Sequence, residues 1–145
     1  MDFDMHNNTA AANALDIQAI TTDTTTVGNI IDTRSATLGP ANAIEFTSHM
    51  GTVTDGDYTW QLFHGDAADM ADEVQVTTST LGLLGTMPAY TADTDDDKVA
   101  RFGYIGKLRY LRVKVVSANT SSGALAGATA LLGKPDTVPT AAQYT

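Results

Sequence analysis

The chain has 145 residues and a formal net charge of −9, from 17 Asp and Glu against 8 Lys and Arg. A single domain is expected at this length, and a chain of this size can bury a core without covalent cross-links. Cysteine is absent, which excludes disulfides and thiolate metal sites, and the sequence pI of about 4.4 argues against a protein that wraps nucleic acid.

The N-terminal segment, residues 1–14, consists mainly of polar and small residues, with isolated larger apolar side chains at Phe3 and Met5. It lacks the basic and apolar regions of a secretory signal, and no apolar run in the chain is as long as a membrane span. We expect a flexible arm that orders on a partner, with a short helix possible over Ala10–Leu15. No contact with a membrane is expected.

Short runs of alternating apolar and polar residues, separated by Gly, Pro, Asn and Asp, fill residues 15–135. Thr24–Ile31 is β-branched, with Gly28 as a bulge or a site of close approach. The turn signals Asp55-Gly56 and Gly106-Lys107 predict two tight hairpins. This pattern predicts an all-β protein: a single antiparallel β-sandwich or jelly-roll-like domain of about eight strands at 15–135, followed by a C-terminal tail at 136–145.

Six of the eight basic residues lie between positions 98 and 114, in a window without Asp or Glu. The alternation slips by one between Tyr110 and Leu111, which indicates either a β-bulge or the emergence of one of these side chains on the polar face. The simplest interpretation is a charged edge strand, and the functional one is a cationic stripe that docks on an acidic protein surface. Nucleic acid is not expected, because aromatic residues do not interleave as stacking platforms.

Acidic clusters and histidines are the groups with possible metal-binding or catalytic chemistry. Asp93–Asp97 begins like a calcium loop, but Gly is missing at its sixth position and Glu at its twelfth. A second acidic cluster occupies residues 66–73, and His49 and His64 offer at most a pair of ligands across a hairpin. The sequence contains no nucleophile elbow, phosphate loop, dinucleotide motif or zinc-protease motif. We therefore expect no enzymatic activity, no cofactor and no metal.

Five segments, taken in order, resemble a group of small structural proteins of tailed bacteriophages and prophages: GNIIDT, IEFTSHMGTVTDGDYTWQLFHGD, LLGT, GYIGKLRYLRVKVV and GALAGATALLGKP. The resemblance covers about residues 12–135, and the chain departs from the group's pattern at Met87-Pro88, in the Asp-rich loop and at Lys107-Leu108. It implies a capsid decoration (cement) protein, made in the host bacterial cytoplasm and bound to the outer surface of the virion head. Such proteins clamp adjacent subunits of the major capsid protein, commonly as homotrimers.

Two alternatives remain: a tail or head–tail connector component, and a carbohydrate-binding β-sandwich for host attachment. The second needs exposed aromatic platforms, whereas the only Trp, Trp60, alternates with Tyr58 and Leu62 in a pattern typical of a core strand. The expected partners are the major capsid protein and further copies of this chain. The residues expected at these interfaces are Phe3, Met5, Asp55, Tyr58, Pro88, Tyr90, Arg109, Tyr110 and Arg112.

Overall fold

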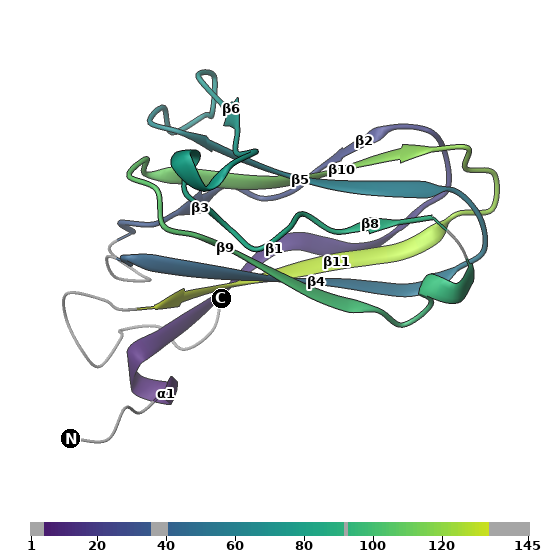
Figure 1. Cartoon of the computed structure of the whole chain (residues 1–145), viewed down its shortest axis with the longest axis horizontal. Helices are drawn as coiled ribbons and strands as arrows, with labels where there is room; N and C mark the ends of the chain where they lie inside the picture. The colour runs from purple at the N-terminus through teal and green to yellow at the C-terminus, as the bar shows by residue number, and fades with distance from the viewer. Residues whose placement is uncertain (1–4, 36–40, 92, 134–145) are drawn as a thin grey trace.

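The computed structural model describes residues 5–35, 41–91 and 93–133, and shows two antiparallel β-sheets packed face to face (Figure 1). The five-stranded sheet has the order β1-β11-β4-β9-β7. The six-stranded sheet has the order β2-β10-β5-β6, with β3 also paired to β10 and β8 to β5. The predicted all-β sandwich is confirmed.

The elements are α1 (Met5–Asn8), β1 (Thr9–Ile20), β2 (Thr25–Val27), β3 (Ile31–Asp32), β4 (Ala43–Val53), β5 (Asp57–Gly65), β6 (Val74–Gln75), η1 (Ser79–Leu81), β7 (Leu83–Leu84), β8 (Ala89–Tyr90), η2 (Asp93–Asp95), β9 (Val99–Tyr104), β10 (Tyr110–Ala118) and β11 (Ala124–Gly133).

The strand pairs are nested like those of a long hairpin that has been rolled up. The outermost pair is β1 with β11, followed by β2 and β3 with β10, then β4 with β9, and finally β5 with β6 and β8. Because β2 and β3 share one side of β10, and β6 and β8 share one side of β5, these strands fill eight positions, four in each sheet. This is the topology of a jelly roll, in which β7 is a short addition beside β9.

Both turns that the sequence marks as hairpins are connections between the two sheets. Asp55-Gly56 joins β4 of the five-stranded sheet to β5 of the six-stranded sheet, and Gly106-Lys107 joins β9 to β10 in the same way. The hairpin predictions are therefore wrong, although the turn positions are right. The turn residues give the chain its change of direction, but they do not determine which sheet receives the next strand.

The first strand begins earlier than the sequence indicates. β1 starts at Thr9 and pairs with β11 from Thr9↔Gly133 to Ile20↔Ala124, so residues 9–14 belong to the sheet and not to an arm. The helix considered for Ala10–Leu15 is replaced by this strand, while the single helical turn α1 lies before it. Among the described residues, no helix is long and apolar enough to cross a membrane.

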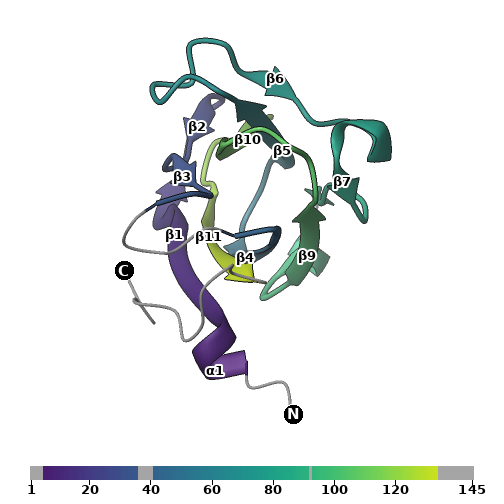
Figure 2. The ribbon, with the colours of Figure 1, turned by 90° about the vertical axis from the view of Figure 1, so that its left-hand side faces the viewer.

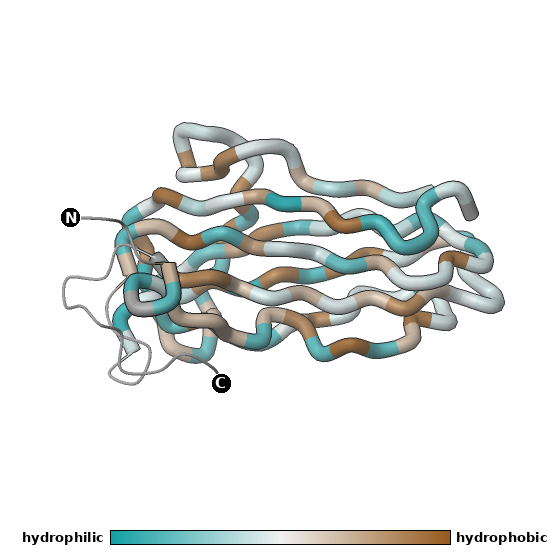
Figure 3. The backbone as a smooth tube through the Cα atoms, turned by 90° about the horizontal axis from the view of Figure 1, so that it is seen from below, coloured by the Kyte–Doolittle hydropathy of each residue, from teal (hydrophilic) through white to brown (hydrophobic). Residues whose placement is uncertain are grey.

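The core lies between the sheets, which enclose it when the molecule is viewed end on (Figure 2). Phe46 of β4 stacks on Phe102 of β9 with ring centroids 5.3 Å apart, and Trp60 of β5 is 1% exposed. The inward residues of β11 between Ala124 and Ala130 are all Ala, which leaves room for these large rings. Hydropathy alternates along the strands as the predicted period of two requires (Figure 3).

The C-terminal part of the basic segment, from Tyr110, belongs to β10, a regular strand in the interior of its sheet. β10 pairs with β5 without a register shift from Tyr110↔Gly65 to Ala118↔Asp57, and with β2 and β3 on its other side. The edge-strand and bulge interpretations are therefore wrong. The slip in alternation arises because the strand begins at Tyr110, whose side chain lies on the same outward face as Arg112 and Lys114.

Candidate interaction surfaces

Arg109 lies just before β10 and is paired with an acid of its own chain. Its Nε and Nη2 atoms each donate to Asp32 at 2.8 Å, and its guanidinium lies 5.0 Å from the centre of the Tyr110 ring. The hydrogen bonds from Arg109 outweigh the effect of burial and hold the pKa of Asp32 below its ordinary value. Arg109 therefore anchors β3 beside β10, and the structure offers it an internal acidic partner.

Arg112 and Lys114 also meet an acid from the same chain. Glu73, in the loop before β6, accepts hydrogen bonds from Arg112 Nη2 at 2.5 Å and from Lys114 Nζ. Lys114 Nζ also lies 4.3 Å from the centre of the Phe63 ring. Burial opposes ionisation of Glu73, but the hydrogen bonds from Lys114 and Arg112 outweigh it and lower the pKa of Glu73. Glu73 and its loop thus cover Arg112 and Lys114, two residues of the predicted cationic stripe.

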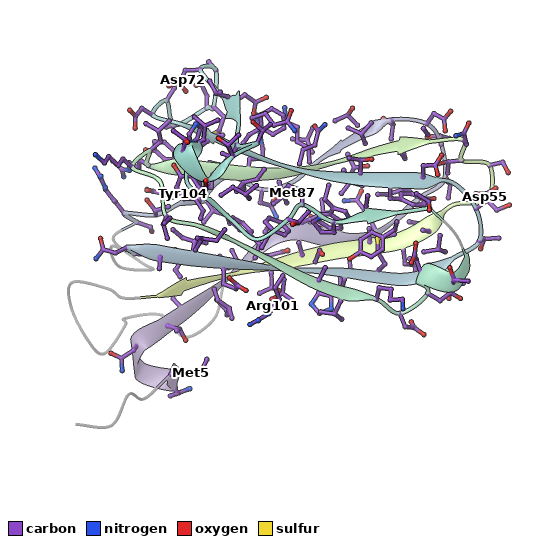
Figure 4. All side chains as sticks on the ribbon, in the orientation of Figure 1. Met5, Asp55, Asp72, Met87, Arg101 and Tyr104 are labelled. Carbon is purple, nitrogen blue, oxygen red and sulfur yellow. The ribbon has the colours of Figure 1, made fainter. Side chains whose placement is uncertain are left out.

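The connection between β4 and β5 is fastened by Asp55 at one end of the sandwich (Figure 4). Its carboxylate accepts hydrogen bonds from the Ser121 hydroxyl and from three backbone N–H groups, at residues 121–123, in the loop between β10 and β11. Gly56 has φ of +97°, and Tyr58 Oη donates to the carbonyl of Asp55 at 2.8 Å. The hydrogen bonds from Ser121 and Gly123 lower the pKa of Asp55. We call this arrangement the Asp55 corner.

The connection between β9 and β10 is fastened by Tyr104 at the opposite end (Figure 4). Its hydroxyl lies 2.9 Å from His64 Nδ1 and accepts a hydrogen bond from the Leu108 N–H at 3.2 Å. A side chain at Gly106 would collide with this hydroxyl, so the turn needs Gly there. Burial raises the pKa of Tyr104 and lowers that of His64. We call this arrangement the Tyr104 corner.

The residues predicted for interfaces have mixed positions. Tyr58 is fully buried and Tyr90 is 5% exposed, so neither can act as a surface anchor in this fold. Pro88 is half-buried, and its carbonyl accepts the Trp60 N–H at 3.1 Å. Met5 is 61% exposed, whereas Phe3 lies outside the described residues.

Carboxylates of both acidic clusters accept backbone N–H groups. Asp72 accepts the N–H groups of Asp66 and Ala67, and Asp96 accepts that of Val53. His49 and His64 lie in different sheets, so the predicted pairing across a hairpin is wrong. In the described part of the chain, no group of three or more His, Asp or Glu residues is placed to hold a metal ion.

The outward side of the five-stranded sheet, here called the five-strand face, is poor in charge. Along β11, β4 and β9 its charged residues are Glu45 and Arg101, which pair with each other at 3.5 Å. Ile17, Val99 and Leu125 are 84%, 60% and 46% exposed on this side. A solvated sheet face normally carries polar residues at alternate positions. The five-strand face, viewed in Figure 3 and marked by Arg101 in Figure 4, is therefore a candidate interaction surface.

An irregularity in β1 places Ile17 on this face. The pairing with β11 shifts register between Asn13 and Leu15 and again between Leu15 and Gln18. Asp16 Oδ1 holds the bulge by accepting hydrogen bonds from the side-chain amides of Asn13 and Asn29 at 2.6 and 3.1 Å. Ile17 then lies over Gly127, where an added Cβ would be 2.7 Å from Ile17 Cγ1, and is flanked by two shallow hollows of about 670 and 200 Å³.

Sequence reasoning missed this surface because it searched for charge and aromatic residues. The signal was present in the small or uncharged residues at alternate positions of Ala124–Gly133 and in Thr47 and His49. Recognising it requires knowing which of the two alternating sets points outward, and that depends on the pairing of the sheets.

Comparison of the sequence with models of known protein families and with curated proteins finds no match.

Proposed function

We propose that the protein is a structural component of a tailed-bacteriophage virion, a decoration protein that binds the outer surface of the head and clamps subunits of the major capsid protein. One observation carries the proposal: the motifs that resemble the phage group form the two corners of the jelly roll. TDGDYTW supplies the Asp55 corner, and GYIGKLRY supplies the Tyr104 corner. The resemblance thus falls on residues that hold this particular topology together.

The architecture suits a clamp. Loops at the Asp55 corner are tied down by side-chain caps, and a rigid surface loses less conformational entropy when it binds. Binding to the assembled shell alone would stabilise that shell by mass action, and repetition over a lattice multiplies weak contacts. The proposed capsid contacts are the N-terminal arm with Phe3 and Met5 and the loops around Pro88 and 93–97. Self-association as a homotrimer is part of what the resemblance implies.

The jelly roll alone does not decide the function, because this fold occurs in both viral shells and lectins. A carbohydrate-binding role would require exposed aromatic rings, and Trp60 is buried in the core. Binding of the purified protein to a glycan array would favour that alternative. A tail or head–tail connector component differs from a decoration protein in copy number, since connectors are rings of about six or a dozen subunits.

The deciding experiment counts and removes the protein. Quantitative gels of purified virions should show hundreds of copies per particle, whereas about six or a dozen would contradict decoration. Heads that lack the protein should bind it when it is added back and should then resist heating better. A variant without residues 1–8 should keep its thermal unfolding curve but bind heads less well, because β1 begins at Thr9. A variant without residues 136–145 is the matched control for shortening the chain.

A further inference from the structure

The five-strand face carries a row of outward positions that crosses the sheet. Ala126 and Ala128 pair with Gln18 and Leu15, which brings Ile17 level with Gly127. Gly127 pairs with His49, and His49 pairs with Val99. The row therefore reads Ile17, Gly127, His49, Val99, with its two large, exposed apolar side chains at opposite ends.

The charges that flank this row lie on opposite sides of it. Asp16, next to Ile17, and Lys98, next to Val99, are both exposed. Because β1 and β9 run in opposite directions, Asp16 and Lys98 flank the row on different sides. A second copy of the row, turned end for end, would therefore set an apolar residue against an apolar one at both ends, with the charged residues outside these contacts.

The size of the face is sufficient for such a contact. Four adjacent strands at about 4.8 Å spacing, over about nine residues of about 3.4 Å each, give roughly 600 Å² on each copy. Two such faces bury about 1,200 Å², which is the lower limit for stable protein–protein interfaces. On the outward side of the six-stranded sheet, by contrast, Glu73 and its loop lie over Arg112 and Lys114.

We propose that two copies of this chain pack their five-strand faces together around a two-fold axis that runs along the strands. Ile17 of each copy then meets the partner's Val99. Such a contact is isologous, since the same surface serves both copies. It does not depend on capsid binding, and as a dimer it differs from the homotrimer that the sequence resemblance implies.

The experiment measures the mass of the purified full-length chain by light scattering and sedimentation. The wild type should be a dimer. Ile17→Asp and Val99→Lys should each be monomeric, because each places two charges against apolar side chains at the interface. Val27→Asp is the matched control: Val27 is 50% exposed on β2 of the other sheet, and the variant should remain dimeric. Circular dichroism should show the same folded spectrum for all variants.

Mixing the two monomeric variants tests the reversed register directly. In a mixed pair, one end joins the introduced Asp to the introduced Lys, and the other end keeps the native contact between Val99 and Ile17. An equimolar mixture should therefore form a heterodimer, seen by native mass spectrometry with one variant tagged. A monomeric wild type, a trimeric wild type, or a mixture that stays monomeric would each overturn the proposal.

Discussion

At the scale of single residues, His64 makes stability depend on pH. The ring is 7% exposed, and its pKa lies below the ordinary value of 6.5 mainly because burial disfavours the charged form, with Asp66 and Asp72 acting in the opposite direction. The unfolded chain therefore binds more protons than the folded one just below pH 6.5, and stability falls as the pH drops through this range. Denaturant unfolding at several pH values between about 5 and 8 should show this loss.

His64→Gln is the matched variant for this prediction, because an amide can still hydrogen-bond to the Tyr104 hydroxyl. It should flatten the pH dependence between about 5 and 7 while changing stability at pH 8 much less. An unchanged slope would show that another group is responsible.

Glu73 offers a test of the covered cationic stripe. Glu73→Ala removes the acceptor for Arg112 and Lys114, whose side chains are only 17% and 15% exposed, and should cost about 1–2 kcal/mol in the free energy of unfolding. Glu45→Ala is the control, because its pair with the 75% exposed Arg101 should contribute about 0.5 kcal/mol or less. Equal losses of unfolding free energy in the two variants would mean that the Glu73 cluster stabilises the fold no more than an exposed ion pair does.

The sequence predicts whether a residue is buried better than it predicts which residue it contacts. The buried positions of Tyr58, Trp60 and Leu62 follow from strict alternation, and the structure confirms them. The partners of Arg109 and Arg112 are separated from them by 77 and 39 positions, so no local pattern identifies Asp32 or Glu73. The close approach predicted at Gly28 is present, since an added Cβ would lie 2.9 Å from the Val113 carbonyl.

At the scale of elements, the Asp55 corner should be the most sensitive loop. One carboxylate there satisfies three consecutive backbone N–H groups and one hydroxyl, so Asp55→Asn removes charge-assisted bonds that tie two loops together. Asp55→Asn should lower the thermal unfolding midpoint more than Asp69→Asn does, because Asp69 accepts a single N–H, that of Ala71. Because the pKa of Asp55 is lowered, its contribution is present above about pH 4 and is lost on further acidification.

The strands themselves could be predicted, but their connections could not. Alternation locates most of β4, β5, β10 and β11, since it depends only on which residues face the core. Whether Asp55-Gly56 closes a hairpin or crosses between sheets depends on what the neighbouring loop offers, here the N–H groups at residues 121–123. The same reasoning explains β1, whose small residues 9–14 become a strand only because β11 lies beside them.

At the scale of the whole molecule, the two sheets share one core and should unfold together. Phe46 belongs to the five-stranded sheet, and Trp60, the only Trp, belongs to the other. Phe46→Ala should lower the free energy of unfolding by about 3–5 kcal/mol, because it removes a fully buried ring stacked on Phe102. Trp60 fluorescence and far-UV circular dichroism should report the same unfolding midpoint, both in the wild type and in Phe46→Ala. Separate midpoints for the two signals would mean that the sheets are independent units.

Salt distinguishes an apolar contact between copies from an electrostatic one. A cationic stripe that docked on acidic loops of another copy would dissociate as ionic strength rises, but Arg109, Arg112 and Lys114 find their acids within the chain. If copies meet through the five-strand face, the dimer should be as tight in about 1 M NaCl as in about 0.1 M, because apolar burial resists screening. Sedimentation equilibrium at both salt concentrations measures the dissociation of the dimer. Glu73→Ala is the control, because it leaves Arg112 and Lys114 without their acidic partner. A wild-type dimer that dissociates in high salt would mean that charged residues, and not the five-strand face, form the interface.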